Sequence, residues 1–556
     1  MNPEVSALAD ELVAIRFTEE PLEAALLGLS EGNVGLADLS AAAENEARAA
    51  YEDVAVQARA LRDRLIASST TLNEVDLVTL DHVQFSAVTH TEFLAARGVE
   101  FSISDFHIAP LSALIATLYQ LPLDSEDRRA AHLQRLATVP RFLEQAAERH
   151  REGIAHGRTP TARGVRAAIA QIDEVLGDDD LGGLRQHLDI ENDSFASTQD
   201  ELLDGSVRLA LSSYRDFLER EALPVGRSDE RAGLHWLPDG EDLYATFVRA
   251  WTSTSRTPAE LHATGRALIE QLNTEFATIG ARLWATTDVG EIHERLRSDP
   301  VLRYADSEEI LSSAVAAVRR AELAAPEWFG LIPSTPCAVE PVPDALASGS
   351  APAYYFTGAL DGSRPGTYFV NTSKPEQRFR HMAEAVAFHE AVPGHHFQLT
   401  IAQEASGHMV FSVFGDTASA EGWGLYAERL ADEMNLYSGD LTRLGMLSTD
   451  AWRAARLVVD TGLHALGWSR QEAIDWMASH VPMSHLEVES EVDRYIVMPG
   501  QALSYMVGRL ELEALRRRAS ERLAVRDFHD LVLRTGPVAL PALGSAITRS
   551  IDARSH

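Results

Sequence analysis

Pro393 and Gly394 interrupt a stretch of chain that carries three histidines, and this interruption limits how the stretch can fold. Proline has no N–H group, and its ring clashes with the preceding turn of a regular helix. We therefore expect a helix that carries His389 to kink or end near Val392. A short irregular step at Pro393 and Gly394 would then return His395 to the neighbourhood of His389.

His389 and Glu390 form a His-Glu dipeptide, which can serve a metal centre in two ways. The imidazole ligates a zinc ion, and the neighbouring carboxylate takes a proton from water. In the common motif the second histidine follows four residues after the first, but Pro393 occupies that position here. We favour His395 as the second ligand, because His396 on a regular helix would lie roughly 10 Å further along than His389. His396 would then point to a carboxylate or to the substrate, and the choice between the two histidines stays open.

A later stretch, residues 419–428, offers carboxylates for the third ligand. Glu421 and Glu428 lie seven residues apart and would share one face of a helix. We favour Glu421 as the ligand, since the small residues 418–420 would let this helix pack closely against the helix of His389. Glu428 can then accept a hydrogen bond from a ligating histidine.

The available ligands lead to a hypothesis about chemistry. Cys337 is the sole cysteine, so an intrachain disulfide and a zinc site built of thiolates are both excluded. A His-Glu pair alone is usually an ordinary part of a helix, but two histidines after a Pro-Gly break, with a carboxylate downstream, favour a metal site. The leading hypothesis is a zinc-dependent hydrolase of amide bonds, with Glu390 as general base.

The motif His-Glu-x-x-Pro-Gly-His-His at residues 389–396 also resembles the hallmark of DUF885, a family of bacterial proteins of unknown function regarded as zinc metallopeptidase-like. The N-terminal half of the chain is similar to the family only loosely, as a helical region. Separated motifs in the same order carry the resemblance through the C-terminal half: residues 364–372, Glu421-Gly422-Trp423, residues 456–464, and the stretch from Arg494-Tyr495 through Pro499-Gly500-Gln501 to Tyr505.

The resemblance implies a fold similar to that of the gluzincins, helical zinc peptidases that enclose a deep substrate channel. Such a channel would favour small peptides, or the ends of longer ones, as substrates. The resemblance names no substrate, so an amide hydrolase of a specialised non-peptide metabolite is a second hypothesis. A third hypothesis, from a different class, is a helical binding protein without catalytic activity, and the intact metal motif argues against it.

The segment from Arg494 to Tyr505 offers further groups that amide hydrolysis needs. Tyr505 can donate its phenol to the developing oxyanion, and Arg494 can pair with a substrate carboxylate. Tyr495 and Tyr505 can equally be core aromatics. His464 would contact the substrate or form a structural hydrogen bond with Asp460. The candidate substrate-binding residues are Arg494, Tyr495, His464, His396 and Asn371.

The hydrophobic pattern predicts a mainly α protein. Residues 1–325 form the predicted N-terminal helical region, and residues 326–556 form the predicted catalytic region. Pro, Gly and aromatic residues between 326 and 372 indicate a small sheet, with strands at 353–356 and 367–370. We expect a two-lobed, gluzincin-like helical body with this sheet beside the active-site cleft, where an extended edge can pair with a peptide backbone.

The chain has 83 acidic and 49 basic residues, which gives a formal net charge of -34. This charge argues against nucleic acid and anionic membranes as partners, because both select basic surfaces. The N-terminus has no basic segment leading into an apolar core, and no run of about 18 apolar residues follows that could cross a membrane. We expect a cytoplasmic protein with Zn²⁺ as cofactor and a small peptide or amide as substrate; the oligomeric state stays open.

Overall fold

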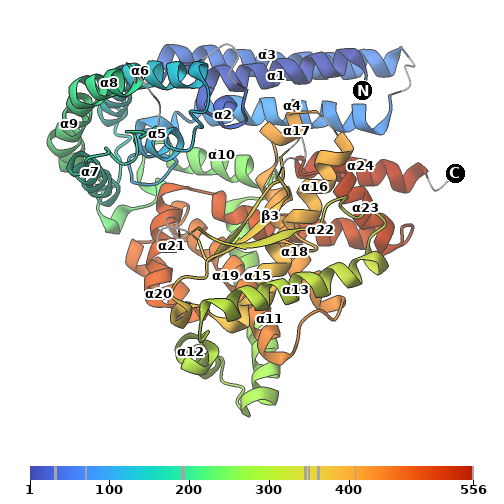
Figure 1. Ribbon diagram of the computed structural model, residues 1–556. Helices are drawn as coiled ribbons and strands as arrows, with labels where there is room; N and C mark the ends of the chain where they lie inside the picture. The colour runs from blue at the N-terminus through green and yellow to red at the C-terminus, as the bar shows by residue number, and fades with distance from the viewer. Residues whose placement is uncertain are drawn as a thin grey trace.

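A small β-sheet lies among α-helices near the middle of the molecule, and most of the rest of the chain is helical (Figure 1). The prediction of a mainly α protein with one small sheet is confirmed. The computed structural model describes residues 1–29, 34–68, 72–188, 194–343, 347, 351–359, 364–406 and 408–553.

The sheet has three strands in the order β1-β3-β2, among the residues that are described. Strand β1 (Ala338–Pro341) is parallel to β3 (Thr367–Val370), and β2 (Ala353–Phe356) pairs antiparallel with the other side of β3. The runs of aromatic and β-branched residues at 353–356 and 367–370 correctly predicted β2 and β3, whereas β1 was not predicted. Because β3 is central, β2 forms one edge of this sheet.

Helices α1 (Pro3–Glu19), α3 (Ala41–Ala67) and α4 (Glu74–Ala95) run along the top of the molecule in Figure 1. Each begins after a polar residue whose side chain accepts a backbone N–H of the first turn, which otherwise has no partner within the helix. Their buried faces join the main hydrophobic core. The capping residues are Asn2, Ser40 and Asn73.

A second hydrophobic cluster lies among the helices at the left of Figure 1. Leu136, Val165 and Leu203 are fully buried within it. The helices that contribute to it include α5 (Pro110–Leu118), α6 (Glu126–Ala155), α7 (Ala162–Gly177), α8 (Ser194–Leu202) and α9 (Arg208–Phe217).

Helix α19 (Asp440–His464) runs through the main core, and from Leu444 to its end every residue except Trp452 is buried. Helix α11 (Pro258–Trp284) packs along it at Gly265, where an added Cβ would lie 2.8 Å from the Cβ of Leu457. Such close backbone contact fixes the position of α19, which later supplies side chains to the candidate site.

Helices α18 (Thr417–Glu433) and α22 (Ser504–Ala519) pack against each other through two glycines. A Cβ at Gly422 would lie 2.4 Å from the carbonyl carbon of Gly508, and a Cβ at Gly508 would lie 1.8 Å from the carbonyl oxygen of Ala418. The two helices can therefore approach this closely only because neither glycine has a side chain.

The remaining helices surround these elements. Helix α13 (Ser307–Trp328) runs across the predicted boundary at 325/326, so that boundary is not a break in secondary structure; the two predicted regions stay a prediction. The others are α2 (Pro21–Leu26), α10 (Gly240–Thr252), α12 (Val289–Ser298), α15 (Ala383–Glu390), α16 (His395–Ser406), α17 (Val410–Val413), α20 (Arg470–His480), α21 (His485–Val497), α23 (Val525–Thr535) and α24 (Leu540–Ala553).

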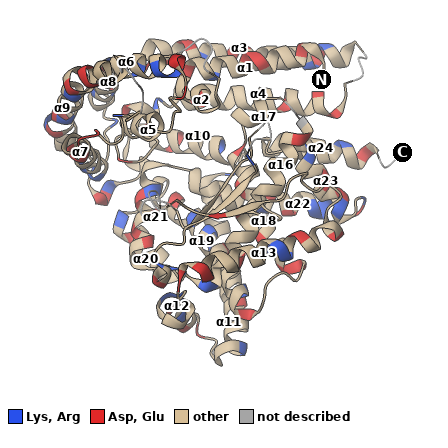
Figure 2. Cartoon of the chain, viewed as in Figure 1, with Lys and Arg blue, Asp and Glu red and all other residues tan. Residues whose placement is uncertain are grey.

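Acidic and basic residues are interspersed along the outer helices, as α7 and α9 illustrate in Figure 2. Many of them form ion pairs, for example Arg215 with Asp173 and Arg151 with Glu221. In the part of the chain that is described, no helix has both the length and the hydropathy needed to span a membrane.

Candidate metal centre

Helix α15 ends at Glu390 and α16 begins at His395, so the helix break expected near Val392 is present. Gly394 is required at this step, because a Cβ there would lie 1.8 Å from the carbonyl oxygen of His389. The indole of Trp423 in α18 donates to the carbonyl oxygen of Pro393 at 2.9 Å. The step is therefore held by α18, and it turns His395 back towards His389.

His389, His395 and Glu421 form a cluster in which each offers one ligand atom, all within 4.8 Å of one another. Oε2 of Glu421 lies 3.3 Å from Nε2 of His389 and 3.6 Å from Nε2 of His395. The two imidazole rings stand almost perpendicular, with their centroids 4.8 Å apart. The structure thus brings together the three residues that were predicted from the sequence as metal ligands.

Glu428 orients the ring of His389. Nδ1 of His389 donates to Oε1 of Glu428 at 2.8 Å, and the Thr449 hydroxyl of α19 donates to the other carboxylate oxygen. Glu428 is fully buried. The expected hydrogen bond from a candidate ligand to Glu428 is confirmed, and it directs Nε2 of His389 into the cluster.

The electrostatics of the cluster follow from its burial and its paired charges. Burial lowers the pKa of His389, but hydrogen bonds to Glu421 and Glu428 outweigh it and raise the pKa to about 10. Burial acts to raise the pKa of Glu421, but His389 and His395 hold that pKa well below its usual value. The two carboxylates therefore stabilise positive charge on the His389 ring.

The ligand set suits zinc, which is commonly bound by histidine nitrogen and carboxylate oxygen in sites with three protein ligands. His395 supplies a further observation: its Nε2 faces Glu421, while its Nδ1 is buried and has no hydrogen-bond partner in the portion of the chain that is described. The side chains of His395 and Glu421 remain 12% and 23% exposed, so the cluster is open to solvent on this side.

His396 points away from the cluster. Its Nε2 donates to the carbonyl oxygen of Thr335, and its Nδ1 lies 3.1 Å from the hydroxyl of Tyr355 in β2. Burial lowers the pKa of His396 to about 4, so the ring is neutral. Among the two candidate histidines, His395 is the one that joins the cluster, and a role of His396 in substrate binding stays a prediction.

Helix α18 approaches His389 through a glycine. A Cβ at Gly424 would lie 2.6 Å from Cε1 and 2.7 Å from Nε2 of His389. Ala418, in contrast, is in contact with Gly508 of α22. The interpretation that small residues at 418–420 allow α18 to approach α15 is therefore corrected, because Gly424 provides the space that the His389 ring fills.

Glu390 follows His389 directly and is held by the sheet. Its Oε2 accepts the backbone N–H of Tyr355 in β2 at 3.0 Å. This bond connects the edge strand of the sheet to the carboxylate next to the cluster.

Tyr505 in α22 lies three residues before Gly508, which packs against Gly422, the neighbour of Glu421. Burial is the main cause that raises the pKa of Tyr505, and the charge of Glu421 raises it further. The guanidinium of Arg456 lies 4.5 Å from the centroid of the Tyr505 ring. The phenol therefore keeps its proton at neutral pH.

Arg494 and Tyr495 belong to a network around Glu491. Arg494 donates to Oε1 of Gln501 at 2.9 Å and to Glu491 at 3.2 Å. The Tyr495 hydroxyl donates to Glu491 at 2.6 Å and accepts from Arg456. Both residues have protein partners, and their predicted roles in substrate binding stay predictions.

His464 and Asn371 also have protein partners. His464 is fully buried, accepts the N–H of Leu234 at its Nδ1, and donates from Nε2 to the carbonyl oxygen of Tyr495. The alternative of a bond to Asp460 is corrected: that carboxylate accepts from Tyr244 and from the N–H of residue 500. Asn371 donates to the carbonyl oxygen of residue 347 at 2.7 Å.

Two arginines near Tyr505 were not predicted as site residues from the sequence. Arg453 and Arg456 are only 8% and 3% exposed. They lie on α19 beside Trp452, with guanidinium carbons 4.0 and 4.4 Å from its ring centroid. Arginines three residues apart are common on exposed helices, so only their burial distinguishes them.

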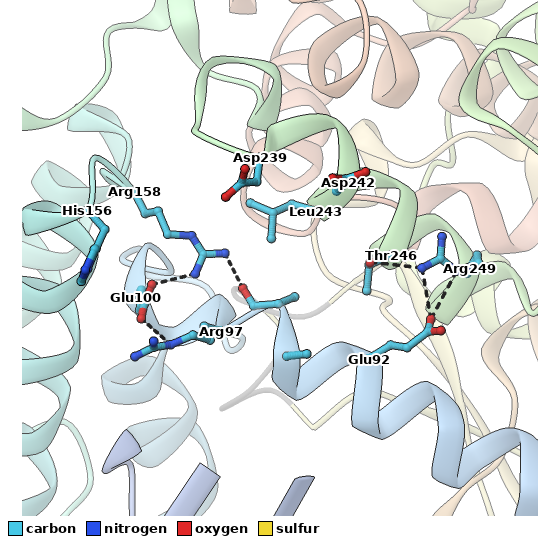
Figure 3. A pocket seen from close by; sticks show the side chains of 12 residues that line it. Glu92, Arg97, Glu100, His156, Arg158, Asp239, Asp242, Leu243, Thr246 and Arg249 are labelled. Atoms are coloured by element: carbon cyan, nitrogen blue, oxygen red, sulfur yellow. Dashed lines mark hydrogen bonds and ion pairs between the residues drawn. The ribbon is translucent and has the colours of Figure 1, made fainter. Parts of the chain in front are cut away.

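A separate pocket of about 490 Å³ lies between α4 and α10 (Figure 3). Figure 3 shows that Arg158 and Arg97 converge on Glu100, while Arg249 pairs with Glu92. None of the residues of the metal cluster lines this pocket. Since its arginines already have acidic partners, we place the chemistry at the cluster.

Comparisons with known proteins agree with this fold. The family described as "Bacterial protein of unknown function (DUF885)" matches residues 21–547, and the chain belongs to this family. No curated protein sequence gives a significant match.

Two solved structures are similar over almost the whole chain. "The putative lipoprotein from Colwellia psychrerythraea" has a TM-score of 0.87 and 23% identity, over 99% of each chain. "A putative lipoprotein of unknown function from Shewanella oneidensis" has a TM-score of 0.75 and 17% identity, over 97% of this chain and 99% of that one. At these identities the similarity shows the fold.

These descriptions correct the expectation of a cytoplasmic protein, because both structural neighbours are described as lipoproteins. The expectation rested on an acidic composition and on the lack of a long apolar run. Neither feature distinguishes between compartments, because a folded acidic body is compatible with either side of a membrane.

Proposed function

We propose that this DUF885 protein is a zinc-dependent hydrolase that cleaves amide bonds. One observation carries the proposal: three helices each present one ligand atom, from His389, His395 and Glu421, within 4.8 Å of one another. Sites with three such protein ligands are typical of catalytic zinc. A bound zinc ion supplies Lewis acidity, which polarises a carbonyl group and makes water more acidic.

The chain's own residues take separate roles in this proposal. Glu428 fixes the ring of His389 through the bond at Nδ1. Glu390 takes a proton from the attacking water as general base and passes it to the leaving amine. The N–H of Tyr355 holds one oxygen of Glu390, which limits the directions in which this carboxylate can turn.

Tyr505 stabilises the oxygen of the amide as negative charge develops on it. Its raised pKa keeps the phenol protonated, and a protonated phenol can donate a hydrogen bond to an oxyanion. The neighbouring arginines add positive charge on the same side.

The substrates proposed are small peptides or the ends of longer ones, in a gluzincin-like architecture. The position of β2 supports a peptide, because an edge strand has backbone groups that can pair with an extended chain. The link from β2 to Glu390 would place such a peptide beside the general base.

The test compares Glu390→Gln with wild type, both loaded with zinc, on a panel of unblocked and end-blocked peptides. We expect unchanged zinc content and a fall in kcat of about 100-fold or more, as for loss of a general base. Glu376→Gln, at an exposed position, is the matched control and should keep full activity.

Other outcomes would redirect the proposal. If zinc-loaded wild type cleaves no peptide but cleaves non-peptide amides, the peptidase assignment is wrong and the amide hydrolase of a specialised metabolite replaces it. If the protein cannot be loaded with zinc at all, the helical binding protein without catalytic activity replaces both.

A further inference from the structure

Arg453 is a buried cation that has no acidic partner in the described part of the chain. It is 8% exposed, and its Nε and Nη1 atoms are buried without a hydrogen-bond partner among the residues that the structure describes. Among the described residues no carboxylate lies within ion-pair distance of it, whereas Asp450, three residues earlier on α19, pairs with Arg429 and Arg509. An unpaired buried charge is costly. An anionic ligand that pairs with this guanidinium would offset that cost.

Arg456 adds a second unsatisfied donor next to the first. Its Nε and Nη2 bond to Tyr495 and Glu491, but its Nη1 is buried and has no hydrogen-bond partner within the described ranges. Arg453 and Arg456 are three residues apart on α19, and residues at this spacing share a helix face. The guanidinium carbons lie 5.7 and 4.5 Å from the centroid of the Tyr505 ring, so both arginines approach the same phenol.

The register of α19 against α18 places this pair beside the metal cluster. Thr449 of α19 donates to Glu428, which holds His389. Arg453 lies one turn after Thr449, roughly 6 Å along the helix axis at about 1.5 Å per residue. Tyr505 extends the connection, because it lies three residues before Gly508, which packs against Gly422, the neighbour of Glu421. A ligand on the two arginines would therefore lie close to the candidate ligands.

We propose that Arg453, assisted by Arg456, binds a carboxylate of the substrate next to the amide bond that is cleaved. This inference rests on the proposed function and narrows it to peptides or amides that carry a carboxylate near the scissile bond. The guanidinium N–H groups donate charge-assisted hydrogen bonds to the carboxylate oxygens. The carboxylate can be the C-terminus of a peptide or the side chain of an acidic residue.

The carboxylate partner in this proposal is Arg453, and not Arg494, which was predicted from the sequence. Arg494 already donates to Gln501 and Glu491 and would have to give up these bonds. Arg453 has no such bonds to lose. It determines specificity in this account and takes no part in proton transfer.

The binding test uses calorimetry on the full chain carrying Glu390→Gln, so that no peptide is cleaved. The probes are one short peptide with a free C-terminus, the same peptide amidated, and an amidated peptide with a C-terminal glutamate. We expect the carboxylate-bearing probes to bind about 10- to 100-fold more tightly than the neutral one, as for hydrogen bonds to charged groups. Whichever carboxylate-bearing peptide binds more tightly than the neutral one shows whether the site takes a C-terminal carboxylate or an acidic side chain.

Arg453→Gln should remove this preference by weakening only the carboxylate-bearing probes. Arg453→Lys keeps the charge and should restore part of the preference. Arg443→Gln is the matched control, because it lies on the same helix with Asp432 as its partner, and it should change nothing. Zinc content and circular dichroism confirm that each variant is folded and loaded.

The two proposals fail separately. Equal binding of the carboxylate and amide probes to the Glu390→Gln chain would overturn the carboxylate subsite and leave the hydrolase untouched; this comparison decides even if Arg453→Gln does not fold. A retained preference in folded Arg453→Gln would overturn the assignment to Arg453. If the carboxylate preference depends on Arg453 but the wild-type protein hydrolyses no amide, the subsite is supported and the proposed hydrolase activity is refuted.

Discussion

Gly424→Ala tests whether the position of the His389 ring controls metal binding. The new Cβ would lie 2.6 Å from Cε1 and 2.7 Å from Nε2 of His389, whereas carbon atoms in contact are about 3.5–4.0 Å apart. The ring would have to move by about 1 Å. A zinc ligand tolerates only about 0.2 Å, and the bond from Nδ1 to Glu428 of the same helix α18 also restrains the ring.

The magnitude follows from the cost of this overlap. Inserting a methyl group into a packed site costs about 1–3 kcal/mol. Since about 1.4 kcal/mol is a factor of ten in an equilibrium constant, the affinity for zinc should fall by roughly 10- to 100-fold. The helix itself gains about 1 kcal/mol when alanine replaces glycine, and in the metal-free protein the ring can move aside and relieve part of the overlap, so this protein should lose less than about 2 kcal/mol of unfolding free energy.

The assay is a competition titration of zinc against a chelating dye, with urea unfolding of the metal-free protein in parallel. Gly544→Ala is the matched control: it lies inside α24, and its new Cβ would be in ordinary contact, 3.6 Å from Leu515. The control should bind zinc as wild type does. A folded Gly424→Ala protein whose zinc affinity stays within about twofold of that of wild type would show that the position of the His389 ring does not control metal binding.

Two further perturbations test other parts of the account. Glu428→Gln keeps the shape of the side chain but removes the charge that faces Nδ1 of His389, so zinc affinity should fall about 10- to 100-fold in the same titration; an unchanged affinity would contradict the orienting role. Burial raises the pKa of Asp460 to about 7, so the folded state keeps a proton that the unfolded state releases near pH 4, and the unfolding free energy falls as the pH rises from about 4 to 7. Asp460→Asn stays neutral throughout and should reduce that fall by up to about 4 kcal/mol in urea unfolding; equal slopes in the two proteins would contradict the raised pKa.

The most useful prediction from the sequence was the helix end before Pro393, which follows from the backbone chemistry of proline. The missing N–H of Pro393 indicates a helix end, and α15 ends at Glu390, a few residues before it. The prediction that His395 takes the role of a histidine four residues after His389 follows from this break. The strands β2 and β3 were equally predictable, because aromatic and β-branched residues fill them, whereas β1, which has the same length, contains a glutamate and ends in a proline, which is unfavourable in a strand.

Tertiary packing decided what the sequence could not predict. A glycine inside a helix, such as Gly424, does not reveal that a histidine ring from another helix fills its space. His464 and Asp460 are four residues apart on one helix, which suggested a bond between them, yet each is bonded to other segments. Arg453 and Arg494 look alike in the sequence, and only the folded chain shows which of them has protein partners.

The most direct test of the central claim is the zinc content of the purified protein by elemental analysis, with His389→Ala, His395→Ala, His396→Ala and Glu421→Ala alongside. We expect about one zinc per chain in wild type and in His396→Ala, because His396 bonds to Thr335 and Tyr355 outside the cluster. We expect loss of zinc in the other three variants. Retention of zinc in His395→Ala with loss in His396→Ala, or no zinc in reconstituted wild type, would contradict this expectation.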